Sequence, residues 1–262
     1  MAIPFKTDNG FGARARLGLV VLQSDETLEP EFARLPVTLP GVSLHHTRIA
    51  SGENVTRESL LEMHNRLPGA VNLFPVGTHF DAIGYGCTSG ATVIGEHAVE
   101  QAIRSSRPGV IVTNPLTALK AACQVMNVQS LGLITPYERR VTDMMANKLR
   151  DFGVRIESVT SFEQTSEATV ARITSDSLLQ AIGHIASTSA TCDAWFVSCT
   201  NLRMAQITSV AEQLVGKPVF SSNQVLAWHL LRLAKINDTL DNWGQLFEFP
   251  LSQSLSNPPN NL

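Results

Sequence analysis

The stretch IGYGCT at residues 83–88 has a counterpart 112 residues later, WFVSCT at residues 195–200. Each is a short, mostly apolar run that ends in Cys-Thr, and the two cysteines are Cys87 and Cys199. Short apolar runs are typical of strands that are buried in a parallel sheet. The pattern therefore predicts that each cysteine lies at the carboxyl end of a buried strand.

Two further pairs of segments recur in the same order along the chain. LGLV at residues 17–20 matches LGLI at 131–134 with an offset of 114, and VTN at 112–114 matches SSN at 221–223 with an offset of 109. A nearly constant offset through three separate segments indicates an internal duplication. We predict two pseudo-symmetric lobes, in which residues 17–115 and 221–240 form lobe 1, residues 116–220 form lobe 2, and residues 1–16 and 251–262 form tails.

Strand-like apolar runs alternate with helical patterns, which is typical of an α/β fold with parallel sheets flanked by helices. The predicted strands cover residues 17–22, 82–85, 110–113, 131–135, 194–197 and 219–221. The predicted helices cover residues 58–66, 92–104, 116–126, 139–152, 177–186, 205–215 and 224–234. Ligands of open α/β sheets bind beyond the carboxyl ends of the strands. We therefore expect both Cys-Thr pairs to face one cleft between the lobes.

The composition and motifs exclude several classes of protein. With 44% hydrophobic residues, 16% charged residues and a net charge of -3, the sequence predicts a globular protein without a basic surface for nucleic acid. No apolar run reaches the roughly 18 to 20 residues of a membrane span, so we expect a cytoplasmic protein without membrane association. The histidines and cysteines show no metal-binding spacing, and no glycine-rich nucleotide motif occurs, so we expect neither a metal nor a cofactor.

Cys87 and Cys199 are the candidate catalytic residues. A thiol at a strand end can have backbone N–H groups of the following turn directed at it, and these donors lower its pKa and can also hold a carboxylate. Two such thiols on either side of a carbon atom can act as base and acid, or one can attack as a nucleophile while the other delivers a proton. A single free cysteine is more often a small buried apolar residue, and this interpretation suits Cys123 and Cys192.

Other polar residues are candidates for binding the substrate. Ser24 and Asp25 follow the first strand, and Asp25 either meets a cationic or hydroxyl group of the substrate or caps the next helix. Tyr137 ends the equivalent strand of the second lobe, where its hydroxyl binds a carboxylate or its ring covers apolar surface. Asn114 and Asn223 match across the repeat, and either orient the substrate and its loops or cap helices.

These motifs resemble those of the aspartate/glutamate racemase superfamily. SDET at residues 24–27, GCTSG at 86–90 and SCTNLR at 198–203 are most similar to the branches of the ectoine-utilisation protein EutA and of maleate cis-trans isomerase. The resemblance covers residues 17–235. It implies a cofactor-independent isomerase or racemase that acts on a small carboxylate, which is amino-acid-like or ectoine-derived. Because relatives often form dimers, it also implies a homodimer.

The resemblance also implies roles for individual residues. In maleate isomerases one thiolate, here Cys87, adds to the double bond, rotation follows, and the other cysteine, here Cys199, donates a proton. In racemases the same pair removes and returns the α-proton. The carboxylate-binding hydroxyls and amides of the family correspond to Thr88, Ser89, Thr200 and Asn201, with Tyr137 as the loop tyrosine.

One residue departs from the maleate isomerase pattern. Asp25 stands where those enzymes usually have asparagine, and an anionic Asp25 would repel a dicarboxylate unless it is protonated. A substrate with a cationic or amide-like group would suit its charge better. Two alternatives remain open, namely an arylmalonate-type decarboxylase or lyase, against which Cys87 counts because that branch keeps only the second-lobe cysteine, and a non-catalytic ligand-binding accessory protein of ectoine catabolism.

Overall fold

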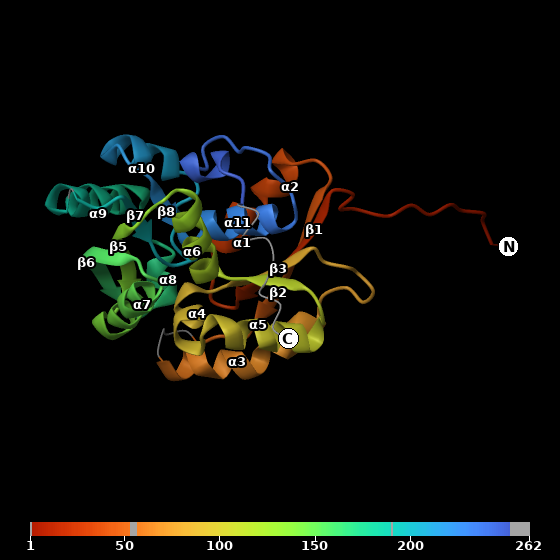
Figure 1. Ribbon diagram of the computed structural model, residues 1–262. Helices are drawn as coiled ribbons and strands as arrows, with labels where there is room; N and C mark the ends of the chain where they lie inside the picture. The colour runs from red at the N-terminus through yellow and green to blue at the C-terminus, as the bar shows by residue number, and fades with distance from the viewer. Residues whose placement is uncertain (1, 53–56, 190, 252–262) are drawn as a thin grey trace.

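The computed structural model describes residues 2–52, 57–189 and 191–251, and contains two four-stranded sheets (Figure 1). The strand order is β2-β1-β3-β4 in the first sheet and β6-β5-β7-β8 in the second. All neighbouring strands are parallel. The two orders are the same once β5 is placed on β1, so the predicted duplication and the predicted fold class are confirmed. The exact residue limits of the two lobes stay a prediction.

The first sheet takes its strands from the N-terminal part of the chain, and β1 and β3 lie inside it. Its strands are β1 (Ala15–Leu22), β2 (Val42–Ile49), β3 (Ala82–Gly86) and β4 (Ile111–Thr113). The helices along this part are α1 (Leu28–Phe32), α2 (Arg34–Thr38), α3 (Arg57–Asn72), α4 (Thr88–Ile94) and α5 (Glu96–Ser106). Every residue of β3 is buried, as expected of an inner parallel strand.

The second sheet repeats this arrangement, with β5 and β7 inside it. Its strands are β5 (Ser130–Tyr137), β6 (Arg155–Gln164), β7 (Ala194–Val197) and β8 (Val219–Ser221). The helices along this part are α6 (Pro115–Val125), α7 (Arg139–Asp151), α8 (Glu167–Val170), α9 (Ser175–Thr188) and α10 (Thr208–Val215). The chain ends with α11 (Ser222–Leu233) and the short 3-10 helix η1 (Gln245–Glu248).

Helix α11 lies between the two lobes and contacts β3 and β4 of one sheet and β8 of the other (Figure 1). It is buried from Ser222 to Arg232, as expected of a helix enclosed by other elements. The hydroxyl of Ser221 accepts a hydrogen bond from the amide of Gln224, and the Gln224 side chain accepts one from the amide of Ser221. This capping box fixes the start of α11, and with it Ser222, at the end of β8.

Three expectations about individual elements were wrong. The edge strand β6 was not among the predicted strands, because many of its residues are partly or fully exposed and it forms no apolar run. The helix predicted at residues 92–104 is two helices, since Gly95 between α4 and α5 has a φ of 94°, which is outside the helical region. Strand β1 begins at Ala15, inside the predicted tail at 1–16.

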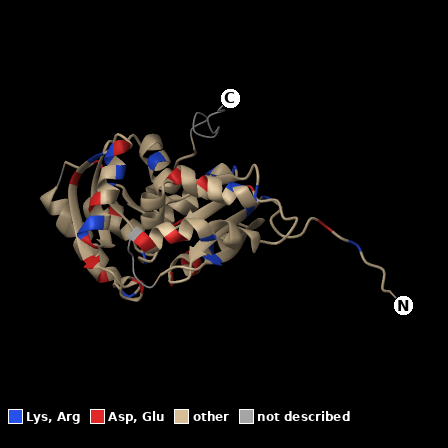
Figure 2. Cartoon of the chain, turned by 90° about the horizontal axis from the view of Figure 1, so that it is seen from below, with Lys and Arg blue, Asp and Glu red and all other residues tan. Residues whose placement is uncertain are grey.

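The surface carries both signs of charge. Figure 2 shows acidic and basic residues interspersed along the elements in view, in agreement with the net charge of -3. Residues 2–10 are exposed, contain no helix or strand, and lead away from the body of the molecule (Figure 1). The C-terminal tail predicted at 251–262 lies outside the described residues except for Leu251. No helix in the described part of the chain is long and apolar enough to cross a membrane.

Candidate active site

The first thiol lies at the junction of β3 and α4. Cys87 follows the last residue of β3, and its Sγ accepts a hydrogen bond of 3.1 Å from the amide of Gly90 in the first turn of α4. The hydroxyl of Ser89 lies 3.5 Å from the same sulfur. A Cβ atom at Gly90 would lie 2.9 Å from this sulfur and 2.3 Å from the hydroxyl of Tyr85, so the turn requires glycine there.

The second thiol lies in the equivalent position after β7. Its Sγ accepts a hydrogen bond of 3.4 Å from the amide of Asn201, and the amide of Cys199 itself donates to the hydroxyl of Ser222 at 2.9 Å. Cys199 has a φ of 122°, a region that favours glycine. Such strain costs roughly 1–3 kcal/mol and is concentrated at functional sites. The backbone strain and the hydrogen bonds both favour a functional role for this cysteine.

The turns that carry the two thiols touch each other. The hydroxyl of Ser222 accepts a hydrogen bond of 2.7 Å from Thr88 and also the bond from the amide of Cys199. The hydroxyl of Thr200 donates to the carbonyl of Gly86, the last residue of β3, at 3.3 Å. Ser222 and Thr200 therefore join the Cys-Thr turn of one lobe to the Cys-Thr turn of the other.

Tyr137 and Glu167 act electrostatically on both thiols. The pKa of the Tyr137 hydroxyl is raised well above its ordinary value by burial first, and then by the charges of Cys199 and Cys87. Glu167, the first residue of α8, raises the pKa of Cys87 and of Cys199 through its charge. The two sulfur atoms thus share these two neighbours. The sequence had indicated Tyr137 as a site residue, but it had not indicated Glu167.

Both thiols are neutral at pH 7 in this arrangement. Burial raises the pKa of Cys87 to about 11, against the opposing effect of hydrogen bonds from Ser89 and Gly90. Burial raises the pKa of Cys199 well above its ordinary value, and the charge of Glu167 adds to the effect. The backbone N–H donors lower the pKa of both thiols, as expected, but desolvation outweighs them and the pKa of each thiol is raised overall. Cys87 is the thiol that ionises more readily.

The two cysteines are almost completely buried. Cys87 is 3% exposed and Cys199 is 5% exposed. Surface cavities occur elsewhere, one of them between α5 and Lys148 and another between α10 and the segment 239–248.

The loop after β1 contributes Asp25 to this region. Its Oδ1 accepts hydrogen bonds from the amides of Thr27 and Leu28 at 2.8 and 2.7 Å, and its Oδ2 accepts one from the hydroxyl of Thr200 at 2.8 Å. Asp25 was expected either to cap the next helix or to meet a group of the substrate. Its hydrogen bonds from the amides of Thr27 and Leu28 match helix capping, and the hydrogen bond from Thr200 places its carboxyl beside the second Cys-Thr turn. Burial raises the pKa of Asp25, against the opposing effect of these hydrogen bonds.

Ser24 and Asn114 form their hydrogen bonds with residues other than the two cysteines. The hydroxyl of Ser24 is 3.1 Å from that of Ser51, and its contacts among the described residues are to this serine. The side chain of Asn114 accepts hydrogen bonds from the amides of Leu116 and Thr117 at the start of α6, so the capping role holds for this residue.

Asn223 joins the second Cys-Thr turn to α1. Its Nδ2 donates to Oε2 of Glu31 at 2.7 Å and to the carbonyl of Thr200 at 2.8 Å. The second oxygen of Glu31 accepts from the amide of Ala205 at 2.9 Å. The Oδ1 of Asn223 is buried and has no hydrogen-bond partner among the described residues. Asn223 thus positions Thr200, whereas its counterpart Asn114 only caps a helix.

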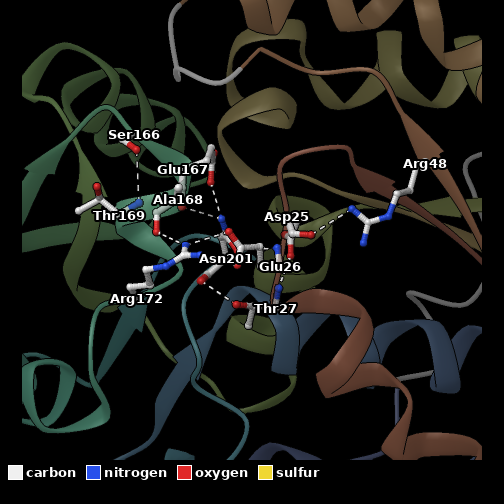
Figure 3. Close-up of polar contacts among 10 residues, drawn as sticks. All are labelled: Asp25, Glu26, Thr27, Arg48, Ser166, Glu167, Ala168, Thr169, Arg172 and Asn201. Carbon is white, nitrogen blue, oxygen red and sulfur yellow. Dashed lines mark hydrogen bonds and ion pairs between the residues drawn. The ribbon is translucent and has the colours of Figure 1, made fainter.

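Asn201 connects the loop of lobe 1 with α8 of lobe 2 (Figure 3). Its Oδ1 accepts from the amide of Glu26 at 2.9 Å, and its Nδ2 donates to the carbonyl of Glu167 at 3.1 Å and to its Oε2 at 2.8 Å. Its backbone carbonyl accepts from the hydroxyl of Thr27 at 2.9 Å. Next to it, Arg172 forms an exposed ion pair with Glu26. The expected site residue Asn201 is therefore the centre of an interlobe network.

Sequence reasoning missed Ser222, Glu31 and Glu167 as parts of this region. Ser222 lies in the repeated SSN segment, so the repeat held a signal for it. Glu167 follows the unpredicted strand β6 and belongs to no repeated segment, so nothing in the pattern indicated it. Within the described ranges no group of three or more His, Cys, Asp or Glu is placed to hold a metal ion.

Two parallel-sheet lobes of the same strand order, each with a thiol at the matching strand end, define the class of two-lobed aspartate/glutamate racemase-like proteins. Within this class the chain belongs to the arylmalonate decarboxylase family, which it matches over residues 95–247.

Maleate isomerases are among the relatives of the chain. It is 25% identical to maleate isomerase of Nocardia farcinica (strain IFM 10152) over 241 residues, which cover 88% of this chain and 94% of that protein. It is also 25% identical to maleate isomerase of Pseudomonas putida (strain KT2440) over 170 residues, which cover 60% of this chain and 67% of that protein.

Solved structures agree with this placement. A mutant of Nocardia farcinica maleate cis-trans isomerase with a covalently bound succinylcysteine intermediate superposes with a TM-score of 0.79 at 25% identity, covering 89% of this chain and 98% of that one. A liganded mutant of arylmalonate decarboxylase gives a TM-score of 0.79 at 20% identity, covering 89% and 99%, which shows the shared fold. The resemblance to the superfamily is confirmed, while the likeness to EutA stays a prediction.

Proposed function

We propose that this protein is a cofactor-independent isomerase or racemase that acts on a small carboxylate with Cys87 and Cys199. The observation that carries the proposal is the hydroxyl of Ser222, which joins the two Cys-Thr turns. The curated maleate isomerases that match the chain support isomerase chemistry. The covalent succinylcysteine in one of the similar structures supports a cysteine that bonds to substrate carbon.

The substrate carboxylate would be held by the backbone of the two Cys-Thr turns. The amides of Thr88, Ser89 and Thr200 have no acceptor among the described residues. Buried donors without partners favour an anionic ligand, because leaving such a group unpaired costs about 1–3 kcal/mol. The hydroxyls of Ser89 and Tyr137 are additional donors on the same side as the thiols.

The chemistry requires one thiol as an anion and the other as an acid. Cys87 ionises more readily, and Gly90 and Ser89 donate hydrogen bonds that stabilise its thiolate. In cis-trans isomerisation the Cys87 thiolate forms a bond to one alkene carbon, the π electrons move to the neighbouring carbon, and Cys199 protonates it. After rotation about the new single bond, the Cys199 thiolate takes its proton back, the bond between Cys87 and carbon breaks as the double bond re-forms, and the trans acid and the Cys87 thiolate are released. In racemisation the thiolate of one cysteine takes the α-proton and the other cysteine supplies one to the opposite face.

A compound with an amino or amide group fits the site better than a dicarboxylate does. Asp25 and Glu167 are both buried near the second Cys-Thr turn, and a dicarboxylate would bring a further negative charge against them. An amino-acid-like or ectoine-derived acid carries the complementary group.

Decarboxylation is the second candidate, because the chain belongs to a family named for it. The two reactions differ in their need for the first thiol. Release of carbon dioxide from an arylmalonate that survives Cys87→Ser but stops with Cys199→Ser would support a decarboxylase.

The direct test uses candidate acids in deuterated water. The purified protein is incubated with single enantiomers of small amino and amido acids, and with maleate and its monoamide maleamate, and the products are followed by NMR. We expect α-deuterium or trans product from at least one acid, and loss of both signals in Cys87→Ser and Cys199→Ser. Turnover that persists in both variants would overturn the proposal.

A further inference from the structure

Glu167 presents an unpaired carboxyl oxygen at the site. It is the first residue of α8 and is 7% exposed. Its Oε2 accepts a hydrogen bond of 2.8 Å from Nδ2 of Asn201, whereas its Oε1 accepts none from the described residues. This oxygen is not among the buried side-chain atoms that lack a partner, so it keeps some exposure and is open to a donor group that enters the site.

The side chain that holds Glu167 also contacts the second thiol. Asn201 binds the Glu167 carboxyl through its side chain and Sγ of Cys199 through its backbone amide at 3.4 Å. Asn201 therefore links the Glu167 carboxyl to the Cys199 sulfur through two hydrogen bonds. The charge of Glu167 also raises the pKa of Cys87 in the other lobe. The carboxyl thus belongs to the surroundings of both thiols and comes from the start of α8.

Asp25, unlike Glu167, cannot accept a hydrogen bond from a ligand without breaking its own contacts. Both of its oxygens accept hydrogen bonds, from the amides of Thr27 and Leu28 and from the hydroxyl of Thr200. The buried Oδ1 of Asn223, which bonds the carbonyl of Thr200 through its other side-chain atom, is a second acceptor without a donor. A ligand that brings N–H groups would supply donors for these two acceptors.

We propose that Glu167 is a specificity-determining residue, whose Oε1 accepts a hydrogen bond from an amide or ammonium group at the end of the substrate away from the carboxylate bound by Thr88, Ser89 and Thr200. The inference rests on the proposed function and narrows its substrate class to acids that carry an N–H donor at the second end. Burial raises the pKa of Glu167 to about 7, so above that pH a second carboxylate at that end would meet Glu167 as a like charge in a buried place, which disfavours dicarboxylates.

Maleate and maleamate test this with a single change of chemistry. They share one carbon skeleton and one carboxylate, and differ at the other end by a carboxylate in maleate and a carboxamide in maleamate. We expect the wild-type protein to have at least a tenfold higher kcat/KM, or affinity by calorimetry, for maleamate. Glu167→Gln should lower this preference by at least tenfold, while Glu167→Asp, which keeps the charge, should retain it.

Glu26→Gln is the matched control, because Glu26 is the neighbouring carboxylate and its side chain pairs only with exposed Arg172 among the described residues. It should leave the maleamate preference within twofold of the wild type.

The outcomes separate the inference from the proposed function. A wild-type protein that prefers maleate, binds neither acid, or keeps its preference in Glu167→Gln overturns the inference. The proposed function then still stands if turnover of any tested acid is lost in both Cys87→Ser and Cys199→Ser. Turnover that survives in both cysteine variants overturns the proposed function, whatever the preference between the two acids.

Discussion

The hydroxyl of Thr88 donates a hydrogen bond of 2.7 Å to the hydroxyl of Ser222, which lies 134 residues further along the chain. Thr88 follows the thiol of one lobe, and Ser222 also accepts the amide hydrogen bond of Cys199 in the other. The pair is buried, so water does not compete for these bonds. The relative position of the two Cys-Thr turns therefore depends on one small hydroxyl side chain at the start of α11.

Replacing Ser222 should affect catalysis more than a structural hydroxyl would. In Ser222→Ala the amide of Cys199 and the hydroxyl of Thr88 lose their buried acceptor, which costs about 1–3 kcal/mol of folding free energy. We expect kcat to fall at least tenfold with a smaller change in KM. Steady-state kinetics and urea denaturation check this. Thr88→Ser, which keeps a donor for Ser222, is the control and should lose less than threefold. Parental kcat in Ser222→Ala would contradict the role.

The two site cysteines should differ sharply from the cysteine in the core. We expect Cys87→Ser and Cys199→Ser to lower kcat/KM at least a hundredfold, because a serine hydroxyl is a far weaker acid than a thiol. Cys123→Ala is the control, since Cys123 is also buried but lies in α6 away from the Cys-Thr turns. It should stay within threefold of the parent. Equal losses in all three variants would point to a general effect of removing a buried thiol.

The buried amide of Asn201 should contribute more to the free energy of unfolding than the exposed ion pair of Arg172 with Glu26. Asn201→Ala leaves the amide of Glu26 without its acceptor and the carboxyl of Glu167 without its donor, so we expect a loss of about 2–4 kcal/mol in the free energy of unfolding. Arg172→Ala removes a pair whose side chains are 64% and 50% exposed, and should cost less than about 1 kcal/mol. Chemical denaturation at one pH compares them. A larger loss in Arg172→Ala would reverse this assignment.

Glu31 should make stability depend on pH in a defined direction. Burial raises its pKa from 4.5 to about 7, although Asn223 and Ala205 donate hydrogen bonds to it. A carboxyl with a raised pKa in the folded state contributes stability that is complete below pH 4.5 and is lost as the pH rises to about 7. Replacing Glu31 with Gln removes this loss.

The measurement is the free energy of unfolding of Glu31→Gln minus that of the parent, at several pH values. This difference should rise by up to about 3 kcal/mol between pH 4.5 and pH 8, because one pKa unit corresponds to about 1.4 kcal/mol. Comparing variant with parent cancels the titration of other groups, such as His229, whose pKa burial lowers to about 4. A difference that does not change with pH would show that Glu31 has an ordinary pKa.

The pattern of apolar residues predicts the inner strands and most helices, but it does not predict the edge strands β2 and β6 of the two sheets. Strands such as β3 and β7 are buried on both faces and form apolar runs, so their place and the cysteines after them were predictable. Strands β2 and β6 each have a sheet neighbour on one side only and many partly exposed residues, so they show no such run.

The sequence by itself determined that the chain is duplicated and that Cys87 and Cys199 follow matching strands, because strand burial and repeats are local properties of the residue order. Only the tertiary structure decided which residues surround the thiols. Glu167 reaches them through folding contacts that join distant segments, for which spacing along the chain carries no signal, and the hydrogen bonds of Ser222 to Thr88 and Cys199 also form only on folding. Tertiary burial also decided the charge state of the thiols, since desolvation depends on everything packed around a group and outweighs the backbone donors beside it.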